Sequence, residues 1–358
     1  MKLLFVSGEY PPDVGGVGDY TRRLRGALAG LGWQSRLLSR GHVRRWDARS
    51  LLALVRAAPR EGAVHIQYQA GAFDLLGDVC LMPVLLRWLR PKVRVVTTFH
   101  DVRVPYLFPR AGRLRSSAIQ LLARGSHAVI AADSRDLSVL GAPSPRHHHV
   151  PIGSNVPCAL PRDFQRADFR SKLGFQPNAL VVAYFGLLNA SKGLDLLLDA
   201  FSRIEAKRPD ARLLLLGGEV GASDPTDRLT ASSVRARLDD RVIQTGWLEA
   251  SALSTHLLAA DVALLPYVDG ASPRRGSLLA CAEHGLPIVS TQPATSEVAD
   301  AVHAVPSDAA ALAEAVLQVC SNSTLASRLK DGASALAKAV AWPTIAAAHV
   351  RIYESFGV

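Results

Sequence analysis

The sequence predicts an α/β protein made of two doubly wound parallel-sheet domains that face a central cleft. The chain has 358 residues, which is long enough for two domains of ordinary size. Short β-branched or leucine-rich runs alternate with longer segments of helical periodicity, as in parallel sheets covered on both faces. A composition of 49% hydrophobic and 20% charged residues excludes wholesale disorder, a collagen-like repeat and a coiled coil.

Short apolar runs in both halves of the chain are expected to form the strands. They are continuous rather than alternating, which is typical of strands buried on both faces of a parallel sheet. The expected strands of the first half are 2–7, 35–39, 63–67, 93–97, 127–131 and 149–152. Those of the second half are 180–185, 212–216, 242–245, 261–265, 287–290 and 302–305. Two sets of about six strands imply two similar domains.

The seam between the domains is expected near residue 158, because prolines and a glycine interrupt the chain there. These residues are Pro151, Gly153, Pro157 and Pro161. We therefore expect an N-terminal domain over 1–158, a C-terminal domain over 159–341 and a terminal helix over 342–358. The apolar face of that helix is expected to consist of Ile345, Val350, Ile352 and Phe356.

The positive charge of the chain is concentrated in its first half. Residues 1–150 carry 22 Lys and Arg against 10 Asp and Glu, which gives +12, whereas residues 151–358 carry 19 against 21, which gives −2. A basic half predicts attraction to phosphates, to an anionic acceptor or to an anionic membrane surface. Nucleic acid is disfavoured, because the arginines lie along helices without interleaved aromatic residues. The alternative is a solvated, arginine-rich surface.

The sequence gives no sign of a membrane span, a disulfide framework or a zinc site. The first apolar residues are too few for a signal peptide, and no uninterrupted apolar run reaches the length of a spanning helix. A cytoplasmic chain is therefore expected, with association at a membrane surface left open. The cysteines lack CxxC spacing and are expected to be buried thiols; they are Cys80, Cys158, Cys281 and Cys320. The triplet His147–His149 is a possible metal patch, but a strand or loop is favoured because neighbouring strand residues point to opposite faces.

The first motif joins the opening strand to a helix through a loop that contains Gly15 and Gly16. The apolar residues of the helix keep helical spacing; they are Val17, Tyr20, Leu24, Leu28 and Leu31. Glycines let the backbone approach a ligand, and the helix start offers free N–H groups to an anion. The dinucleotide fingerprint GxGxxG is not satisfied. A tight turn without a ligand is the alternative.

Two further motifs follow expected strands. His100 and Asp101 come directly after the strand at 93–97, where the carboxyl end of a parallel strand would present them to a sugar hydroxyl or a phosphate. Lys192 lies beside Gly193 at a helix start, after the first strand of the second domain, where an ammonium suits a diphosphate. A structural histidine and a surface lysine are the respective alternatives.

The fourth motif is the most specific, because it places cations and backbone donors at one helix start. It runs from Asp269 through Arg274, Arg275 and Gly276 to Ser277. Fixed guanidinium groups, the helix dipole and free N–H groups together suit a pyrophosphate.

Together these segments resemble the group 1 glycosyltransferases, family 4, of the GT-B fold, with two Rossmann-like domains. The similarity runs nearly end to end and includes the hinge at 151–156, the segment at 246–248 and the strand at 261–266. The resemblance implies that the second domain binds a nucleoside-diphosphate sugar and the first binds a sugar, lipid-linked or small-molecule acceptor. It also implies transfer with retention of anomeric configuration, without a metal or cofactor.

The resemblance assigns roles residue by residue. Lys192 matches the diphosphate lysine of the family, and Gly246, Trp247 and Leu248 would lie against the base. His100 would lie beside the transferred sugar, with Gly15 and Gly16 near the donor phosphates or the acceptor. His100, Asp101 and Asp269 are the candidate catalytic residues, and Arg274, Arg275, Gly276 and Ser277 complete the donor site.

The sequence departs from the family pattern at three positions. Leu187 stands where the family has an arginine, and Ser272 and Ala280 stand where it has two glutamates. The pattern resembles a branch in which the Asp-Gly…Arg-Arg-Gly-Ser loop replaces these glutamates. We infer that Arg274 and Arg275 supply the missing positive charge, and that Asp269 takes over a carboxylate role. A catalytically silent nucleotide-sugar-binding scaffold and a same-fold epimerase remain the alternatives.

Overall fold

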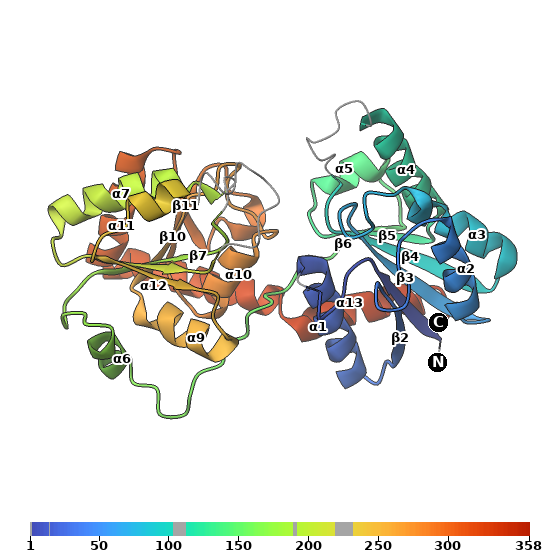
Figure 1. Cartoon of the computed structure of the whole chain (residues 1–358), viewed down its shortest axis with the longest axis horizontal. Coiled ribbons are helices and arrows are strands. Elements are labelled where there is room, and N and C mark those ends of the chain that lie inside the picture. The colour runs from blue at the N-terminus through green and yellow to red at the C-terminus, as the bar shows by residue number, and fades with distance from the viewer. Residues whose placement is uncertain (1, 14, 103–111, 189–191, 219–231) are drawn as a thin grey trace. The chain divides into compact units, whose positions relative to one another are not determined.

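The computed structural model describes residues 2–13, 15–102, 112–188, 192–218 and 232–358 (Figure 1). It divides the chain into two compact units, Met1–Gly153 together with Val340–Val358, and Ser154–Ala339. These boundaries lie a few residues before those expected from the sequence. Residues 14 and 189–191, which belong to the first and third motifs, lie outside the described residues.

The first unit holds a six-stranded parallel sheet in the order β2-β1-β3-β4-β5-β6. Its strands are β1 (Leu3–Ser7), β2 (Ser35–Leu38), β3 (Gly62–Tyr68), β4 (Val93–Phe99), β5 (Ala128–Ala131) and β6 (His147–His149). Each expected strand has a counterpart, but β6 begins two residues before the predicted 149–152. It is therefore the histidine triplet that pairs with β5.

Helices cover both faces of this sheet. They are α1 (Gly16–Gly30), α2 (Ala48–Ala57), the 3₁₀ turn η1 (Asp78–Leu81), α3 (Met82–Leu89), α4 (Gly112–Gly125), α5 (Asp136–Leu140) and α13 (Trp342–Glu354). Side chains alternate along β1, so Leu4 and Val6 pack with α2, η1, α3 and α4. Leu3 and Phe5 pack with α1 and α13 on the opposite face.

The second unit repeats the architecture with the strand order β12-β11-β10-β7-β8-β9, again parallel. Its strands are β7 (Val181–Phe185), β8 (Arg212–Leu216), β9 (Val242–Gly246), β10 (Val262–Leu265), β11 (Ile288–Thr291) and β12 (Val302–Val305). Its helices are α6 (Arg166–Lys172), α7 (Leu194–Lys207), α9 (Ala250–Ala259), α10 (Gly276–Glu283), η4 (Ser296–Val298), α11 (Ala309–Ser321) and α12 (Ser323–Ala339). The predicted fold class of two doubly wound parallel sheets is confirmed.

Three details of the predicted core are wrong. Leu31 follows the last turn of α1 and is exposed, so the apolar face of α1 ends at Leu28. The buried face of α13 includes His349 and Tyr353, whereas Val350 and Phe356 are only partly buried. Two of the four cysteines, Cys158 and Cys320, are exposed. Among the described residues, no helix is both long and apolar enough to cross a membrane.

Candidate functional site

A cavity of about 460 Å³ opens at the carboxyl edge of the second sheet. Ligands of doubly wound proteins bind at this edge. The cavity is lined by Asn155, Val156, Phe185, Gly186, Leu187, Lys192, Gly217, Gly218, Trp247, Leu248, Leu253, Gly276 and Ser277. Five of the predicted donor-binding residues are therefore brought together here, namely Lys192, Trp247, Leu248, Gly276 and Ser277. Gly246 directly precedes Trp247 at the end of β9.

Glycines allow the loops around this cavity to pack closely. Gly193 has φ +66°, and a Cβ there would lie 2.0 Å from the carbonyl oxygen of Pro266. The loop that carries Lys192 is thus held directly against the segment that follows β10. Gly217 has φ +115°, and a Cβ there would lie 2.2 Å from the carbonyl oxygen of Gly186. Both positions require glycine, because the backbone is left-handed and the neighbour is main chain.

Two cations meet over one aromatic ring beside the cavity. The Lys192 Nζ lies 5.2 Å from the ring centroid of Tyr267, and the Arg275 Cζ lies 4.6 Å from the same centroid. The Tyr267 ring is fully buried, and its hydroxyl lies 2.7 Å from the Ser277 Oγ. A fixed, buried ring therefore sets the position of both positive charges, which are attracted to its face.

The shared position destabilises the charged form of the lysine. Burial, followed by the positive charge of Arg275, lowers the pKa of Lys192 from 10.5 to about 8. Binding of an anion beside Lys192 would stabilise the protonated form of its side chain, because a nearby negative charge favours the ammonium.

The first turn of α10 adds backbone donors beside these cations. Gly276 and Ser277, the first two residues of α10, line the cavity. The N-cap residue Arg275 makes no side-chain hydrogen bond to the turn. The first turn of a helix has backbone N–H groups without intrahelical acceptors and carries a partial positive charge. Two side-chain cations and a helix N-terminus form an arrangement that can hold a diphosphate.

The other residues of the fourth motif have different surroundings. Asp269 forms an ion pair with Arg275, so its carboxylate fixes the guanidinium beside Tyr267. Arg274 and Arg275 are both half-buried, and neither lines the cavity. Leu187 lines the cavity, whereas Ala280 is fully buried within α10.

In the first unit, His100 follows β4 and is held by neighbouring side chains. Its Nε2 lies 2.9 Å from the Gln67 Oε1, and its ring meets the edge of the Tyr20 ring at a centroid distance of 4.7 Å. Because an amide oxygen only accepts, Nε2 carries the proton and donates it to Gln67. The other ring nitrogen, Nδ1, is then an acceptor. Asp101 follows directly and is half-buried.

Gln67 links His100 to a buried polar network that reaches α13. The Gln67 Nε2 donates to the His65 Nε2 at 3.1 Å, and the His65 Nδ1 lies 2.6 Å from the Tyr353 hydroxyl. The third histidine, His349, packs against His65 with a ring-centroid distance of 5.5 Å. Burial, the first cause in each case, lowers the pKa of all three histidines, which keeps them neutral at ordinary pH.

The helix start of the first motif differs from the expectation. The Glu9 Oε1 accepts hydrogen bonds from the backbone N–H of Val17 at 2.9 Å and of Gly18 at 3.2 Å. These donors are therefore not free for a ligand anion, since the chain supplies its own carboxylate. A Cβ at Gly15 would lie 2.1 Å from that carboxylate, whereas a Cβ at Gly16 would meet nothing within 4 Å. The glycine at position 15 thus makes room for Glu9.

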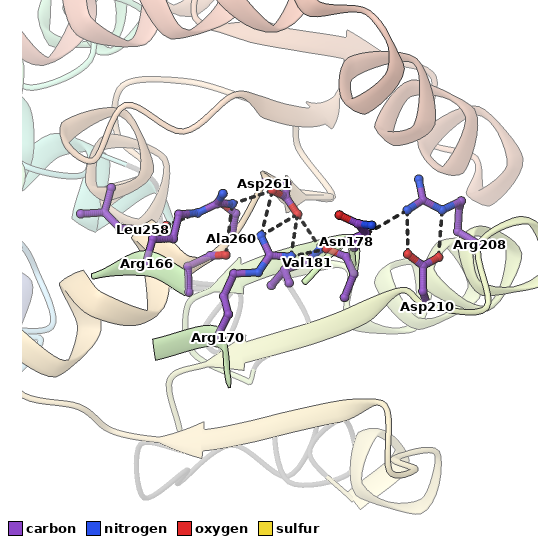
Figure 2. Close-up of polar contacts among 11 residues, drawn as sticks. Arg166, Arg170, Asn178, Val181, Arg208, Asp210, Leu258, Ala260 and Asp261 are labelled. Carbon is purple, nitrogen blue, oxygen red and sulfur yellow. Dashed lines mark hydrogen bonds and ion pairs between the residues drawn. The ribbon is translucent and has the colours of Figure 1, made fainter. Parts of the chain in front are cut away.

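A second cavity of about 360 Å³ lies at the amino edge of the second sheet, and the three arginines that line it are engaged by neighbouring groups (Figure 2). Arg166 donates to the carbonyl of Leu258 at the end of α9 and, with Arg170, to the carboxylate of Asp261. Arg208 is paired with Asp210 at 2.7 Å. The contacts of Arg166 and Arg170 attach α6 to the base of the sheet, so these two residues have a structural role.

Sequence reasoning did not assign three residues that organise these sites, Tyr267, Gln67 and Glu9. Tyr267 lies two residues before the fourth motif, and an aromatic residue shortly after a buried strand was the available signal. Gln67 is a polar residue at the end of a buried apolar strand, which is itself unusual. Nothing in the sequence pairs Glu9 with the start of α1.

Sequence comparison finds a family model that matches part of the second unit and relatives that match about a third of the chain. Residues 179–322 match the family model described as glycosyl transferases group 1. A D-inositol 3-phosphate glycosyltransferase of Segniliparus rotundus is 30% identical over 117 residues, or 33% of this chain and 26% of that protein. A GDP-mannose-dependent monoacylated alpha-(1-6)-phosphatidylinositol monomannoside mannosyltransferase of Corynebacterium glutamicum is 34% identical over 125 residues, or 34% of this chain and 31% of that protein. The matches thus span about a quarter to a third of these relatives.

Structural comparison extends over the whole chain. A sucrose-phosphate synthase from Thermosynechococcus elongatus superposes with a TM-score of 0.74 at 20% identity, covering 100% of this chain and 99% of that one. Anabaena HepE in complex with UDP gives a TM-score of 0.74 at 16% identity, covering 99% and 100%. The chain therefore has the GT-B fold of these structures, and its residues 179–322 are similar in sequence to the group 1 glycosyl transferases.

Proposed function

We propose that the chain is a retaining glycosyltransferase that moves a sugar from a nucleoside-diphosphate donor to an acceptor hydroxyl. The observation that carries this proposal is that Lys192 and the first turn of α10 line one cavity at the carboxyl edge of the second sheet, with Arg275 beside Lys192 over the Tyr267 ring. A nucleoside diphosphate combines a planar base with a strongly anionic group. The wall of the cavity offers it the exposed Trp247 and the Lys192 ammonium.

The proposed chemistry places the developing negative charge on the leaving group. The bond between the anomeric carbon and the diphosphate oxygen breaks, and its electron pair leaves with the diphosphate. The acceptor oxygen bonds to the same face of that carbon and passes its proton to the departing diphosphate oxygen. Lys192 and Arg275 stabilise the departing diphosphate, so the reaction requires neither a metal nor a cofactor under this proposal. We propose that His100 and Asp101 contact the sugar, and that Asp269 acts through Arg275.

The printed names of the relatives support the donor class. One relative depends on GDP-mannose, and solved HepE structures contain UDP or UDP-glucose. The acceptors named among the relatives are an inositol phosphate and an acylated phosphatidylinositol mannoside. We therefore propose a sugar, lipid-linked or small-molecule acceptor in the synthesis of a surface glycan, a glycolipid or a small glycoside.

A donor panel tests the proposal. The chain is incubated with UDP-, GDP- and ADP-sugars, and release of the free nucleoside diphosphate is measured with and without simple glycosides as acceptors. At least one donor should turn over. Lys192→Ala should lose this activity, whereas Lys207→Ala at the far end of α7 should keep it. Turnover of a donor that survives Lys192→Ala would contradict the assignment of the site.

A catalytically silent sugar-nucleotide-binding protein is the second candidate. The observation in its favour is Leu187, which lines the cavity at the place where the family resemblance expects an arginine. The same panel separates the two, because a silent protein binds a nucleoside diphosphate in calorimetry but turns over no donor.

A further inference from the structure

The outward side of α3 and η1 in the first unit is apolar and exposed. Four side chains make up this surface, which we call the α3 face, with exposed fractions of 45% for Leu81, 46% for Val84, 86% for Trp88 and 47% for Leu89. The inward side of the same helix packs Met82 and Leu86 into the core. A helix that is apolar on both sides is normally covered on both sides, and no described residue covers this one.

The helices beside α3 also carry exposed apolar side chains. The helix α3 packs between α2 and α4 on one side of the first sheet (Figure 1). Leu52 on α2 and Leu121 on α4 are also exposed. A group of large exposed apolar side chains on adjoining elements differs from the scattered ones of an ordinary surface and marks an interaction site.

The segments that carry this surface are predominantly basic. Residues 47–61 contain three arginines against Asp47 and Glu61, and residues 78–92 contain two arginines and a lysine against Asp78. Arg49, Arg56, Arg87 and Lys92 are exposed. A positive rim around an apolar centre complements a surface that is negative outside and apolar inside.

We propose that the α3 face docks the first unit onto an anionic lipid bilayer, with Trp88 at the level of the headgroups. Indole side chains favour the interface between water and hydrocarbon, and basic residues beside them are attracted to anionic headgroups. A second copy of the chain fits this surface poorly, because a symmetric dimer would bring two positive rims together. This inference does not depend on the proposed glycosyl transfer.

Vesicle co-sedimentation of the whole chain tests the proposal. Vesicles of phosphatidylcholine alone are compared with vesicles of equal parts phosphatidylcholine and phosphatidylglycerol. The chain should co-sediment with the anionic vesicles at low salt and largely release them when salt shortens the screening length to about 3 Å. Trp88→Glu should reduce bound protein at least tenfold. This side chain lies in solvent, so the melting temperature should not change.

Matched substitutions distinguish vesicle binding through the α3 face from binding that depends only on net charge or on exposed apolar side chains in general. Lys92→Glu should weaken binding several-fold, whereas Arg36→Glu, on the exposed edge strand β2, changes the net charge equally and should have less effect. Leu31→Glu controls for loss of an exposed apolar side chain elsewhere in the unit. Equal effects of Lys92→Glu and Arg36→Glu would overturn the proposal, as would unaltered binding by Trp88→Glu. Absence of vesicle binding, with Trp88-dependent dimers or protein complexes instead, would also overturn it.

Discussion

The affinity of the chain for UDP or GDP should depend on pH through Lys192. The pKa of this lysine lies near 8 because burial and the charge of Arg275 disfavour its protonated form. A bound diphosphate restores the higher pKa, since it supplies negative charge beside the ammonium. The lysine must therefore take up a proton when the ligand binds at high pH. Its contribution to affinity is fully present below pH 8 and is lost above it.

The magnitude follows from proton linkage. Between the free and the bound pKa, affinity should fall about tenfold for each pH unit. Arg275→Ala should weaken binding at neutral pH by about 1.5 to 3 kcal/mol, the range for a lost charge-assisted hydrogen bond. The same change removes the repulsion on Lys192, so the fall in affinity should move to higher pH. The effects of Arg275→Ala and Lys192→Ala should therefore be non-additive.

Calorimetric titration of UDP and GDP between pH 7 and about pH 10 measures these effects, because the terminal phosphate is already ionised in this range. Lys207→Ala, an exposed lysine paired with Glu314, is the control and should reproduce the wild-type profile. A flat profile up to pH 10 would refute the reasoning, as would a pH profile that Arg275→Ala leaves unmoved.

Three further predictions concern the packing around the sites. Gly193→Ala should destabilise the second unit by more than Gly174→Ala does. Both glycines have positive φ, but only at Gly193 would a Cβ lie against the carbonyl of Pro266. Melting temperatures of the two variants test this, and equal decreases would contradict the packing argument. The neutral buried histidines of the first unit should make it less stable in acid, because the unfolded chain binds more protons than the folded one below pH 6.5. The fully buried His65 and His349 should each lower the free energy of unfolding by about 1.4 kcal/mol for each pH unit below that value. Thermal unfolding between pH 8 and pH 5.5 checks this, and stability independent of pH would exclude it. Gln67→Leu should remove the acceptor of the His100 Nε2 proton, so ¹⁵N spectra should show a mixture of the two neutral tautomers of His100. The value of kcat/KM should fall roughly 3- to 10-fold. An unchanged ratio of tautomers would show that Gln67 does not position the ring.

The parallel sheets were predictable because apolar runs and helical periodicity act locally. Each strand is a short continuous apolar segment, and its partners follow from the doubly wound topology. The cavity of the second unit that contains Lys192 was also partly predictable, since residues at the carboxyl ends of parallel strands meet at one edge. Lys192 and Gly276 are far apart in the chain but line the same cavity for this reason.

The contacts that could not be predicted join side chains across the fold. The carboxylate of Glu9 closes the start of α1, but loop conformation rather than sequence spacing brings it there. The polar network on α13 was missed because only apolar residues were used to define the buried face. Tyr353 is buried opposite a hydrogen-bonding partner, His65 of β3, and the ring of His349 packs against the same histidine.

A crystal structure of the chain with UDP or GDP bound is the most direct test of the central claim. The account predicts that the pyrophosphate lies within hydrogen-bonding distance of the Lys192 ammonium, the Arg275 guanidinium and the first backbone N–H groups of α10. A pyrophosphate bound elsewhere, or one that leaves Lys192 and Arg275 without contact to it, would contradict the account.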